Sequence, residues 1–272
     1  MRTIATIMTS YNRKDKTISC LDSLFSQEEL GEKFHYLIYL VDDGSTDGTS
    51  EAVHLQYPDV RIIPGTGDLY WNRGMHLAFG EALKQDHDFY LWVNDDTTLF
   101  PDALTRLLDT SSLFQDEAII VASTKDPATG EWTYGGLRRL DRCRRLKFTP
   151  IQPGTTPVLI EAMNGNCVLI PRQVARILGN LDPIYSHGMG DYDYSLRAQK
   201  KGVKVVLAPG YYGHCTRNAV PTESKTFRQR FSRMISRKVL PPKDLAVFSK
   251  RYAGPLWPLY WVSPYIRLFF HR

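Results

Sequence analysis

The chain lacks the features of disulfide-rich, zinc-binding and membrane-spanning proteins. Its four cysteines are scattered over 272 residues, and no two form a Cys-x-x-Cys pair. Their scarcity argues against a disulfide framework or a zinc site and favours a reducing compartment. No apolar run reaches the roughly 18–20 residues that cross a bilayer, and Ile4–Met8 is too short for a signal peptide. We therefore expect a cytoplasmic protein without a transmembrane helix.

Three signatures of nucleotide and phosphate chemistry are also missing. The G-x-G-x-x-G fingerprint does not follow the first predicted strand, which argues against a nicotinamide enzyme. A Walker-type G-x-x-x-x-G-K-S/T sequence is absent as well. Asp42-Asp43-Gly44-Ser45 superficially resembles a phosphatase loop, but the nucleophilic position of that loop would fall on Val41, which cannot serve.

The chain has the composition of an ordinary globular protein, with 43% hydrophobic and 23% charged residues and a net charge of +5. Short apolar runs alternate with helical periodicity, which predicts βαβ units and a mostly parallel α/β sheet flanked by helices. The predicted strands are Ile4–Met8, Tyr36–Val41, Val60–Ile63, Phe89–Val93, Ala118–Ala122, Cys167–Ile170 and Val203–Ala208. The predicted helices between them are Asp15–Ser26, Thr49–Gln56, Asn72–Leu83, Pro101–Leu108 and Tyr192–Lys200.

Polar residues follow the first, second and fourth predicted strands. Because the carboxyl ends of parallel strands meet at one edge of a sheet, these three loops should converge on a ligand. A hydroxyl beside an aromatic side chain suits a base and ribose, and carboxylates accept hydrogen bonds from both. The residues concerned are Thr9, Tyr11 and Arg13, then Asp42 and Asp43, and finally Asp95 and Asp96.

Asp95 and Asp96 are adjacent carboxylates at the end of the buried strand Phe89–Val93. Two such groups repel each other, so a cation usually compensates them, and a divalent ion bridging phosphate oxygens is the commonest candidate. An acidic turn that caps the next helix explains the same residues. The residues alone leave a metal site and a helix cap open.

The segment Gly67–Gly74 contains two further candidates near the start of a predicted helix. Arg73 is placed to neutralise a diphosphate, although a solvated surface arginine fits the pattern equally well. Trp71 can stack on a sugar or nucleotide, or it can pack in the core.

Three segments resemble, in order and spacing, the family 2 glycosyltransferases of bacterial cell-surface polysaccharide assembly. They are Met8–Arg13, Val41–Thr49 and Val93–Asp96, within a resemblance that covers about residues 2–215. The resemblance implies the glycosyltransferase-A fold and inverting transfer from a nucleotide-diphosphate sugar. It implies that Thr9, Tyr11 and Asp42 hold the base, that Asp95 lies near the ribose, and that Asp96 ligates Mg²⁺ or Mn²⁺.

The second half of the chain extends this resemblance. The segment 187–197 looks like the Glu-Asp-x-Asp…Arg motif of the family, with Gly190 in place of Glu and Asp191 in the position of the catalytic base. An acceptor hydroxyl needs such a carboxylate to take its proton, although Asp191 can also cap the following helix. The resemblance further implies that His214 completes the metal site and that Asn164, Gly165 and Asn166 line the sugar pocket.

The last part of the chain, residues 217–272, differs in character. Thr226–Leu240 has the pattern of a basic amphipathic helix, and Tyr252–Phe270 combines seven aromatic residues with three prolines. This pattern favours peripheral contact with a membrane over packing on the catalytic domain or a second subunit, and the inner face of the cytoplasmic membrane is the expected place of contact. We expect no nucleic-acid binding, because no reader motif accompanies the charge.

Together these features predict a catalytic domain over residues 1–216 and a basic, aromatic extension over residues 217–272. The predicted function is metal-dependent transfer of a sugar from a UDP- or dTDP-sugar to a glycan or lipid-linked glycan, with Mn²⁺ or Mg²⁺ as cofactor. Two alternatives remain open. One is a non-catalytic sugar-nucleotide or glycan-binding module on the same fold, and the other is a sugar-phosphate nucleotidyltransferase.

Overall fold

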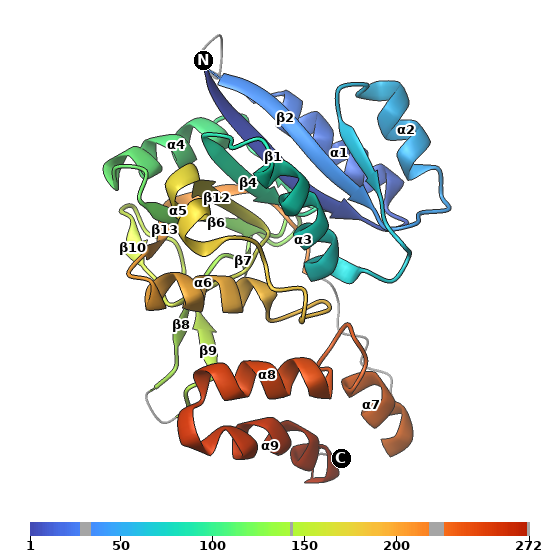
Figure 1. Ribbon diagram of the computed structural model, residues 1–272, viewed down its shortest axis with the longest axis vertical. Helices are drawn as coiled ribbons and strands as arrows, with labels where there is room; N and C mark the ends of the chain where they lie inside the picture. The colour runs from blue at the N-terminus through green and yellow to red at the C-terminus, as the bar shows by residue number, and fades with distance from the viewer. Residues whose placement is uncertain (28–33, 142–143, 218–225, 271–272) are drawn as a thin grey trace.

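The inner strands of the central sheet bury side chains on both faces. In the computed structural model, which describes residues 1–27, 34–141, 144–217 and 226–270, its strands run in the order β10-β13-β6-β12-β4-β1-β2-β3 (Figure 1). They are β1 (Arg2–Ser10), β2 (Phe34–Asp42), β3 (Arg61–Pro64), β4 (Phe89–Val93), β6 (Ala118–Lys125), β10 (Val158–Leu159), β12 (Cys167–Pro171) and β13 (Lys204–His214). Two short strands, β5 (Thr98–Leu99) and β7 (Trp132–Tyr134), pair with β13 and β6.

The pairing confirms the predicted α/β architecture. β1 to β4 are parallel to one another, and β6 is parallel to β13. β12 lies antiparallel between β4 and β6, a direction that hydrophobic periodicity cannot predict. A separate small sheet contains β8 (Gly136–Arg139), β9 (Phe148–Pro150) and β11 (Ala162–Met163).

Helices cover both faces of the large sheet, as the continuous apolar character of its strands requires. One face carries α1 (Lys14–Phe25), α2 (Thr49–Gln56) and α4 (Ala103–Leu113), and the other carries α3 (Tyr70–Leu83), α5 (Arg172–Leu178) and α6 (Gly190–Lys200). Along β4, Leu91 packs into the first core and Trp92 into the second. Polar loops are thereby left at the strand ends, where the candidate site lies.

Two helices differ most from their predicted bounds. Pro101 does not begin a helix, because the preceding residues Thr98–Leu99 pair with β13 and α4 starts only at Ala103. The helix predicted over Thr226–Leu240 ends at Met234 as α7 (Phe227–Met234), and the chain then turns back toward the sheet. The backbone N–H of Leu240 donates to the carbonyl of Met234 in this turn, at 3.0 Å.

The C-terminal extension continues with α8 (Pro242–Tyr252) and α9 (Trp257–Phe270), joined by the 3₁₀ turn Gly254–Leu256. Pro264 lies inside α9 and cannot donate a hydrogen bond to the carbonyl of Tyr260. The hydroxyl of Ser263 donates to that carbonyl instead, at 3.4 Å. Among the helices within the described ranges, none is long and apolar enough to cross a membrane.

The extension is fixed to α6 by a buried polar cluster around Asp193. This fully buried carboxylate accepts hydrogen bonds from Arg197 (2.8 Å), Arg251 (2.9 Å), Tyr252 (2.8 Å) and Tyr185 (3.1 Å). A buried carboxylate is stable only when it is paired and hydrogen-bonded in this way. The segments on either side of the predicted boundary near residue 216 are therefore packed against each other, through the contact between α6 and α8.

Candidate active site

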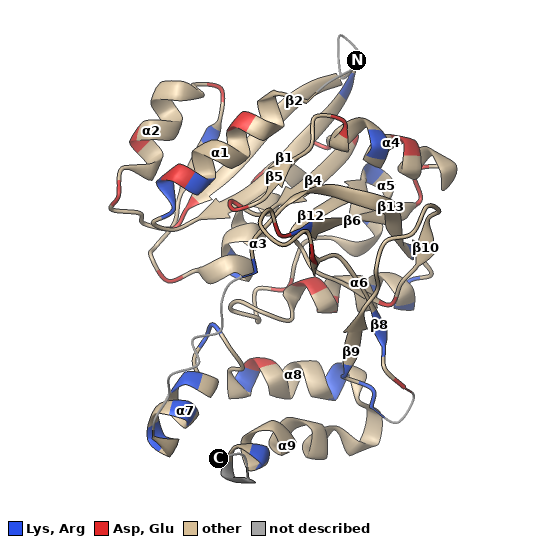
Figure 2. Cartoon of the chain, turned by 180° about the vertical axis from the view of Figure 1, so that it is seen from behind, with Lys and Arg blue, Asp and Glu red and all other residues tan. Residues whose placement is uncertain are grey.

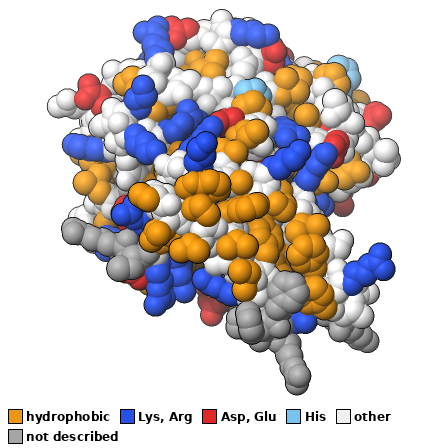
Figure 3. Space-filling model, turned by 60° about the horizontal axis from the view of Figure 1, so that its bottom comes forward, with side chains coloured by type: hydrophobic (Ala, Val, Ile, Leu, Met, Phe, Trp, Pro, Cys, Tyr) orange, Lys and Arg blue, Asp and Glu red, His pale blue; other side chains and the backbone are white. Residues whose placement is uncertain are grey.

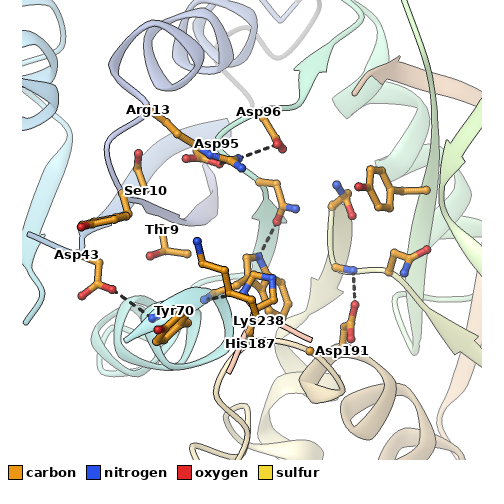
Figure 4. Close-up of a pocket in the computed structure, with 18 of the residues that line it drawn as sticks. Thr9, Ser10, Arg13, Asp43, Tyr70, Asp95, Asp96, His187, Asp191 and Lys238 are labelled. Atoms are coloured by element: carbon orange, nitrogen blue, oxygen red, sulfur yellow. Dashed lines mark hydrogen bonds and ion pairs between the residues drawn. The ribbon is translucent and has the colours of Figure 1, made fainter. Parts of the chain in front are cut away.

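The loops after β1, β2 and β4 open into one cavity of about 410 Å³ (Figure 4). Its other wall comes from the loop before β12 and from the first turn of α6. Most of the residues identified from the sequence line this cavity, namely Thr9, Tyr11, Arg13, Asp43, Trp71, Asp95, Asp96, Asn164, Gly165, Asn166 and Asp191. The strand-end loops therefore converge as the sequence predicts, while the role of each side chain stays a prediction.

Arg13 bridges the two adjacent carboxylates at the end of β4. Its Nη1 atom lies 3.1 Å from Oδ1 of Asp95 and 2.7 Å from Oδ2 of Asp96. Burial raises the pKa of Asp95 to about 6, although the Arg13 charge opposes the rise. The thiol of Cys215 lies 3.5 Å from the other oxygen of Asp96. One guanidinium thus faces two carboxylates, which leaves excess negative charge when both are ionised.

This carboxylate pair fits a cation that is shared with a substrate. Mg²⁺ is usually bound by one or two carboxylates together with water and substrate phosphates, without a closed protein cage. No group of three or more His, Cys, Asp or Glu side chains among the described residues is arranged to hold a metal. His214 lies opposite Thr98 on β5 and packs its ring against Phe100, with centroids 5.0 Å apart. Its role as a ligand stays a prediction.

Asp191 is held at the opposite end of the cavity by two backbone groups. Its Oδ2 atom accepts a hydrogen bond from the N–H of Gly165 (3.1 Å), and its Oδ1 atom accepts one from the N–H of Tyr192 (2.9 Å). The N-cap of α6 is Met189, so Asp191 lies in the first turn and not at the cap itself. Burial raises the pKa of this carboxyl to about 6, in the range suited to a general base near neutral pH.

Gly190 lies outside the cavity, against Asn72. A Cβ atom at Gly190 would lie 1.7 Å from Oδ1 of Asn72, so even alanine cannot fit without movement. Asn72 is fully buried, and its side-chain nitrogen donates to the carbonyls of Asp182 and Tyr185, each at 2.8 Å. The contact with Asn72 explains why glycine occupies this position. The sequence analysis had assigned Gly190 to the sugar pocket, but Gly190 is not among the residues that line the cavity.

Trp71 joins the two walls of the cavity. Its indole N–H donates to Oδ1 of Asn94 at 2.7 Å, and its ring lies edge-on to Trp92. A Cβ atom at Gly165 would lie 2.5 Å from this ring, so glycine allows the loop before β12 to approach it closely. Trp71 therefore packs against the core on one side and lines the cavity on the other.

The two carboxylates at the end of β2, Asp42 and Asp43, accept hydrogen bonds from backbone N–H groups. Asp43 accepts hydrogen bonds from the N–H groups of Gly67 (2.8 Å), Leu69 (2.8 Å) and Tyr70 (3.1 Å), and so fixes the start of α3. Asp42 accepts from the N–H of Ser45 at 2.9 Å and lies outside the cavity lining. These contacts shape the loops around the cavity.

Arg73 lies away from the cavity, and Lys238 reaches it from the extension. The Nε atom of Arg73 donates to the carbonyl of Pro183 at 3.0 Å, on the protein surface. The cavity is also lined by His187 and Lys238, neither of which the sequence singled out as a site residue. Burial lowers the pKa of His187, and Lys238 lowers it further. No local motif marks Lys238, because its position depends on how the extension folds back.

Comparison with known sequences identifies the family of this chain. The sequence profile of Glycosyl transferase family 2 matches residues 5–177, more than half of the chain. Two curated relatives, the N-acetylglucosaminyl-diphospho-decaprenol L-rhamnosyltransferases of two Mycobacterium tuberculosis strains, are each 25% identical over 197 residues. Each match covers 63% of this chain and 64% of the relative, so the chain spans less than two thirds of their length.

Solved structures share the fold at low sequence identity. GalNAc-T7 with UDP, GalNAc and Mn²⁺ has a TM-score of 0.63 and 17% identity, over 86% of this chain and 47% of that one. A mannosyltransferase from Pyrobaculum calidifontis with GDP-Man and Mn²⁺ has a TM-score of 0.56 and 16% identity, over 96% and 69% of the two chains. This likeness shows the glycosyltransferase-A fold, and the profile match shows that the chain belongs to glycosyl transferase family 2.

Proposed function

We propose that the protein is an inverting glycosyltransferase that moves a sugar from a UDP- or dTDP-sugar to a hydroxyl of a lipid-linked acceptor. The observation that carries this proposal is the cavity itself, which has the Asp95–Asp96 pair on one wall and Asp191 on the other. Family membership supports sugar transfer. The relatives named for transfer to N-acetylglucosaminyl-diphospho-decaprenol support a lipid-linked acceptor.

Each of these cavity residues has a separate role in the proposed reaction. Thr9 and Tyr11 contact the base and ribose, and Asp95 lies beside them near the ribose. Asp96 would hold Mn²⁺ or Mg²⁺, and the bound ion would supply positive charge to stabilise the departing diphosphate. Asp191, with a pKa of about 6, is mostly deprotonated at pH 7 and takes the proton of the acceptor hydroxyl as that oxygen attacks the anomeric carbon.

We further propose that the extension rests on an anionic membrane surface, where a lipid-linked acceptor would be found. Figure 3 shows hydrophobic side chains gathered on the face that the C-terminal helices form, with Lys and Arg around them. The exposed apolar residues of this face are Phe227, Phe231, Ile235, Val239, Leu256, Leu259, Trp261 and Ile266. Exposed cations on the same helices, seen in Figure 2, are complementary to anionic lipid headgroups.

Release of nucleotide from a panel of donors tests the proposed reaction. Purified protein is incubated with UDP- and dTDP-sugars, a lipid-linked diphosphate sugar and Mn²⁺, with EDTA in a parallel series. We expect nucleoside diphosphate to be released only when both the acceptor and the metal are present. Failure of every donor to release nucleotide would leave the protein as a binding module and would end the proposal.

A further inference from the structure

The turn between α7 and α8 returns the extension to the mouth of the cavity. Arg237 forms an ion pair with Asp68, and its guanidinium carbon lies 5.8 Å from the ring centroid of Tyr70. The next residue, Lys238, lines the cavity together with Tyr70 and His187. Figure 4 shows these three side chains grouped below Thr9, at the end of β1, and Asp95, in the loop after β4.

This turn is fixed from both sides. The hydroxyl of Tyr265 donates to the carbonyl of Leu240 at 2.8 Å, and the indole of Trp261 donates to the carbonyl of Pro242 at 3.0 Å. At the start of α8, the buried Asp244 accepts two hydrogen bonds of 2.7 Å from the backbone and hydroxyl of Ser186. Ser186 directly precedes His187, so the backbone beside the cavity and the backbone of the turn are tied together.

The charges around the cavity leave Lys238 without an acidic partner. Four carboxylates line the cavity, and Arg13 compensates only the pair after β4. No carboxylate within the described part of the chain lies within ion-pair distance of Lys238, whereas its neighbour Arg237 is paired with Asp68. An ammonium group at the edge of such a cavity attracts an anionic ligand, and phosphoryl oxygens are its usual partners.

We propose that Lys238 binds a phosphoryl oxygen of a diphosphate in the cavity, so that the C-terminal extension completes the site. The proposal rests on the proposed function, and it adds a binding residue that lies outside the matched region 5–177. The diphosphate belongs either to the donor nucleotide or to the lipid-linked acceptor. In both cases a cation from the extension offsets negative charge that Arg13 leaves uncompensated.

Binding measurements with Lys238→Gln test this assignment. Calorimetric titrations with pyrophosphate, UDP and dTDP, in the presence of Mn²⁺, are compared with titrations of uridine and thymidine. We expect the affinity for the diphosphates to fall about tenfold, as a charge-assisted hydrogen bond implies, with nucleoside affinity unchanged. Lys238→Arg should retain most of the affinity. Lys243→Gln, an exposed lysine of α8 outside the cavity lining, is the matched control.

A second arm identifies the source of the diphosphate. The KM of a short-chain, water-soluble N-acetylglucosaminyl-diphospho-lipid is measured for the native protein and for Lys238→Gln. A rise in this KM with unchanged nucleotide affinity would assign Lys238 to the acceptor diphosphate. The proposal would be overturned if Lys238→Gln changed neither the diphosphate affinity nor the acceptor KM. It would also be overturned if the substitution weakened the binding of nucleosides and diphosphates equally. Pyrophosphate binding does not depend on transfer, so inactivity toward every donor would contradict the proposed function and not this assignment.

Discussion

The two walls of the cavity are held together by different kinds of contact. The wall proposed to bind the nucleotide sugar, called the donor wall, is formed by the loops after β1, β2 and β4. In it Arg13 pairs with the adjacent Asp95 and Asp96, and Asp43 accepts a hydrogen bond from the backbone of Gly67. The wall proposed to face the acceptor, called the acceptor wall, is formed by the loop before β12 and the first turn of α6. In it Asp191 accepts a hydrogen bond from the N–H of Gly165. Its helix is fixed through the Asp193 cluster by α8. The donor wall thus follows from strand-end motifs, whereas the acceptor wall depends on the extension.

Asp191→Asn should have the largest effect, and it should change the transfer rate without changing the nucleotide affinity. We expect the transfer rate to fall about 10²–10⁴-fold, because the amide cannot take a proton from the acceptor. The affinity for nucleoside diphosphate should not change, because the donor wall is intact. Single-turnover rates and calorimetric titration measure the two quantities. Asp59→Asn, at an exposed position in the turn before β3, is the matched control. Transfer at the native rate would show that Asp191 is not the base.

Gly190→Ala tests how tightly the acceptor wall is packed. The added Cβ atom meets Oδ1 of Asn72, so we expect the free energy of unfolding to fall by about 1–3 kcal/mol. Gly188→Ala is the control, because a Cβ atom there has no neighbour within 4 Å. Urea denaturation measures both. Equal stability of the two variants would show that the Asn72 contact relaxes without cost.

As pH rises from 4 to 6, the transfer rate should rise, whereas the contribution of Asp191 to the free energy of unfolding should fall. We expect the transfer rate to rise about tenfold per pH unit up to pH 6 and then to level off, because Asp191 must lose its proton to act as a base. The folded pKa of Asp191 is raised above the unfolded value, so the folded state binds more protons between about pH 4 and pH 6. Its contribution to stability is therefore lost as pH rises through this range.

Thermal melts and rate profiles over pH 4–8 provide both measurements. The decline in stability should be shallower in Asp191→Asn, because this variant lacks a carboxyl whose pKa is raised to about 6. Asp95 has a carboxyl with a pKa raised to the same value and is unchanged in the variant. A rate profile that does not change between pH 5 and pH 7 would contradict the assignment of the base.

Contact of the extension with a membrane gives the smallest expected effect. Phe231→Ser and Leu259→Ser remove exposed apolar side chains from α7 and α9, and each should weaken binding to anionic vesicles about fivefold. Leu55→Ser, at a residue of α2 that is 83% exposed, should leave vesicle binding unchanged. Vesicle co-sedimentation measures the binding. An equal effect of all three substitutions would point to non-specific adhesion.

The fold and the convergence of the strand-end loops on one cavity were predicted correctly from the sequence, because both depend on local patterns. An apolar run that ends in Asn94-Asp95-Asp96 marks a buried strand and a polar loop without any knowledge of distant contacts. The same local patterns failed to show that the Asp42 carboxylate binds the backbone of Ser45, or that Arg73 turns toward Pro183. The direction of a side chain is set by its neighbours in space, which residue spacing does not report.

The acceptor wall was predicted only in part, for a related reason. Motif order located Asp191, but nothing near Gly190 in the sequence reveals Asn72 beneath it. Lys238 was missed because the Arg237–Asp68 pair joins residues 169 positions apart. Contacts at that separation carry no periodicity or motif that the sequence alone would show.

The Asp193 cluster has a consequence for chimeric enzymes made within this family. Grafting the tail of another member onto residues 1–216 of this chain would leave Asp193 without the guanidinium of Arg251 and the hydroxyl of Tyr252, unless the graft brought equivalents of both. The carboxylate of Asp193, without these two partners, would lie two residues from Asp191, on the same helix. An exchange of tails would therefore require equivalents of Arg251 and Tyr252 in the new tail.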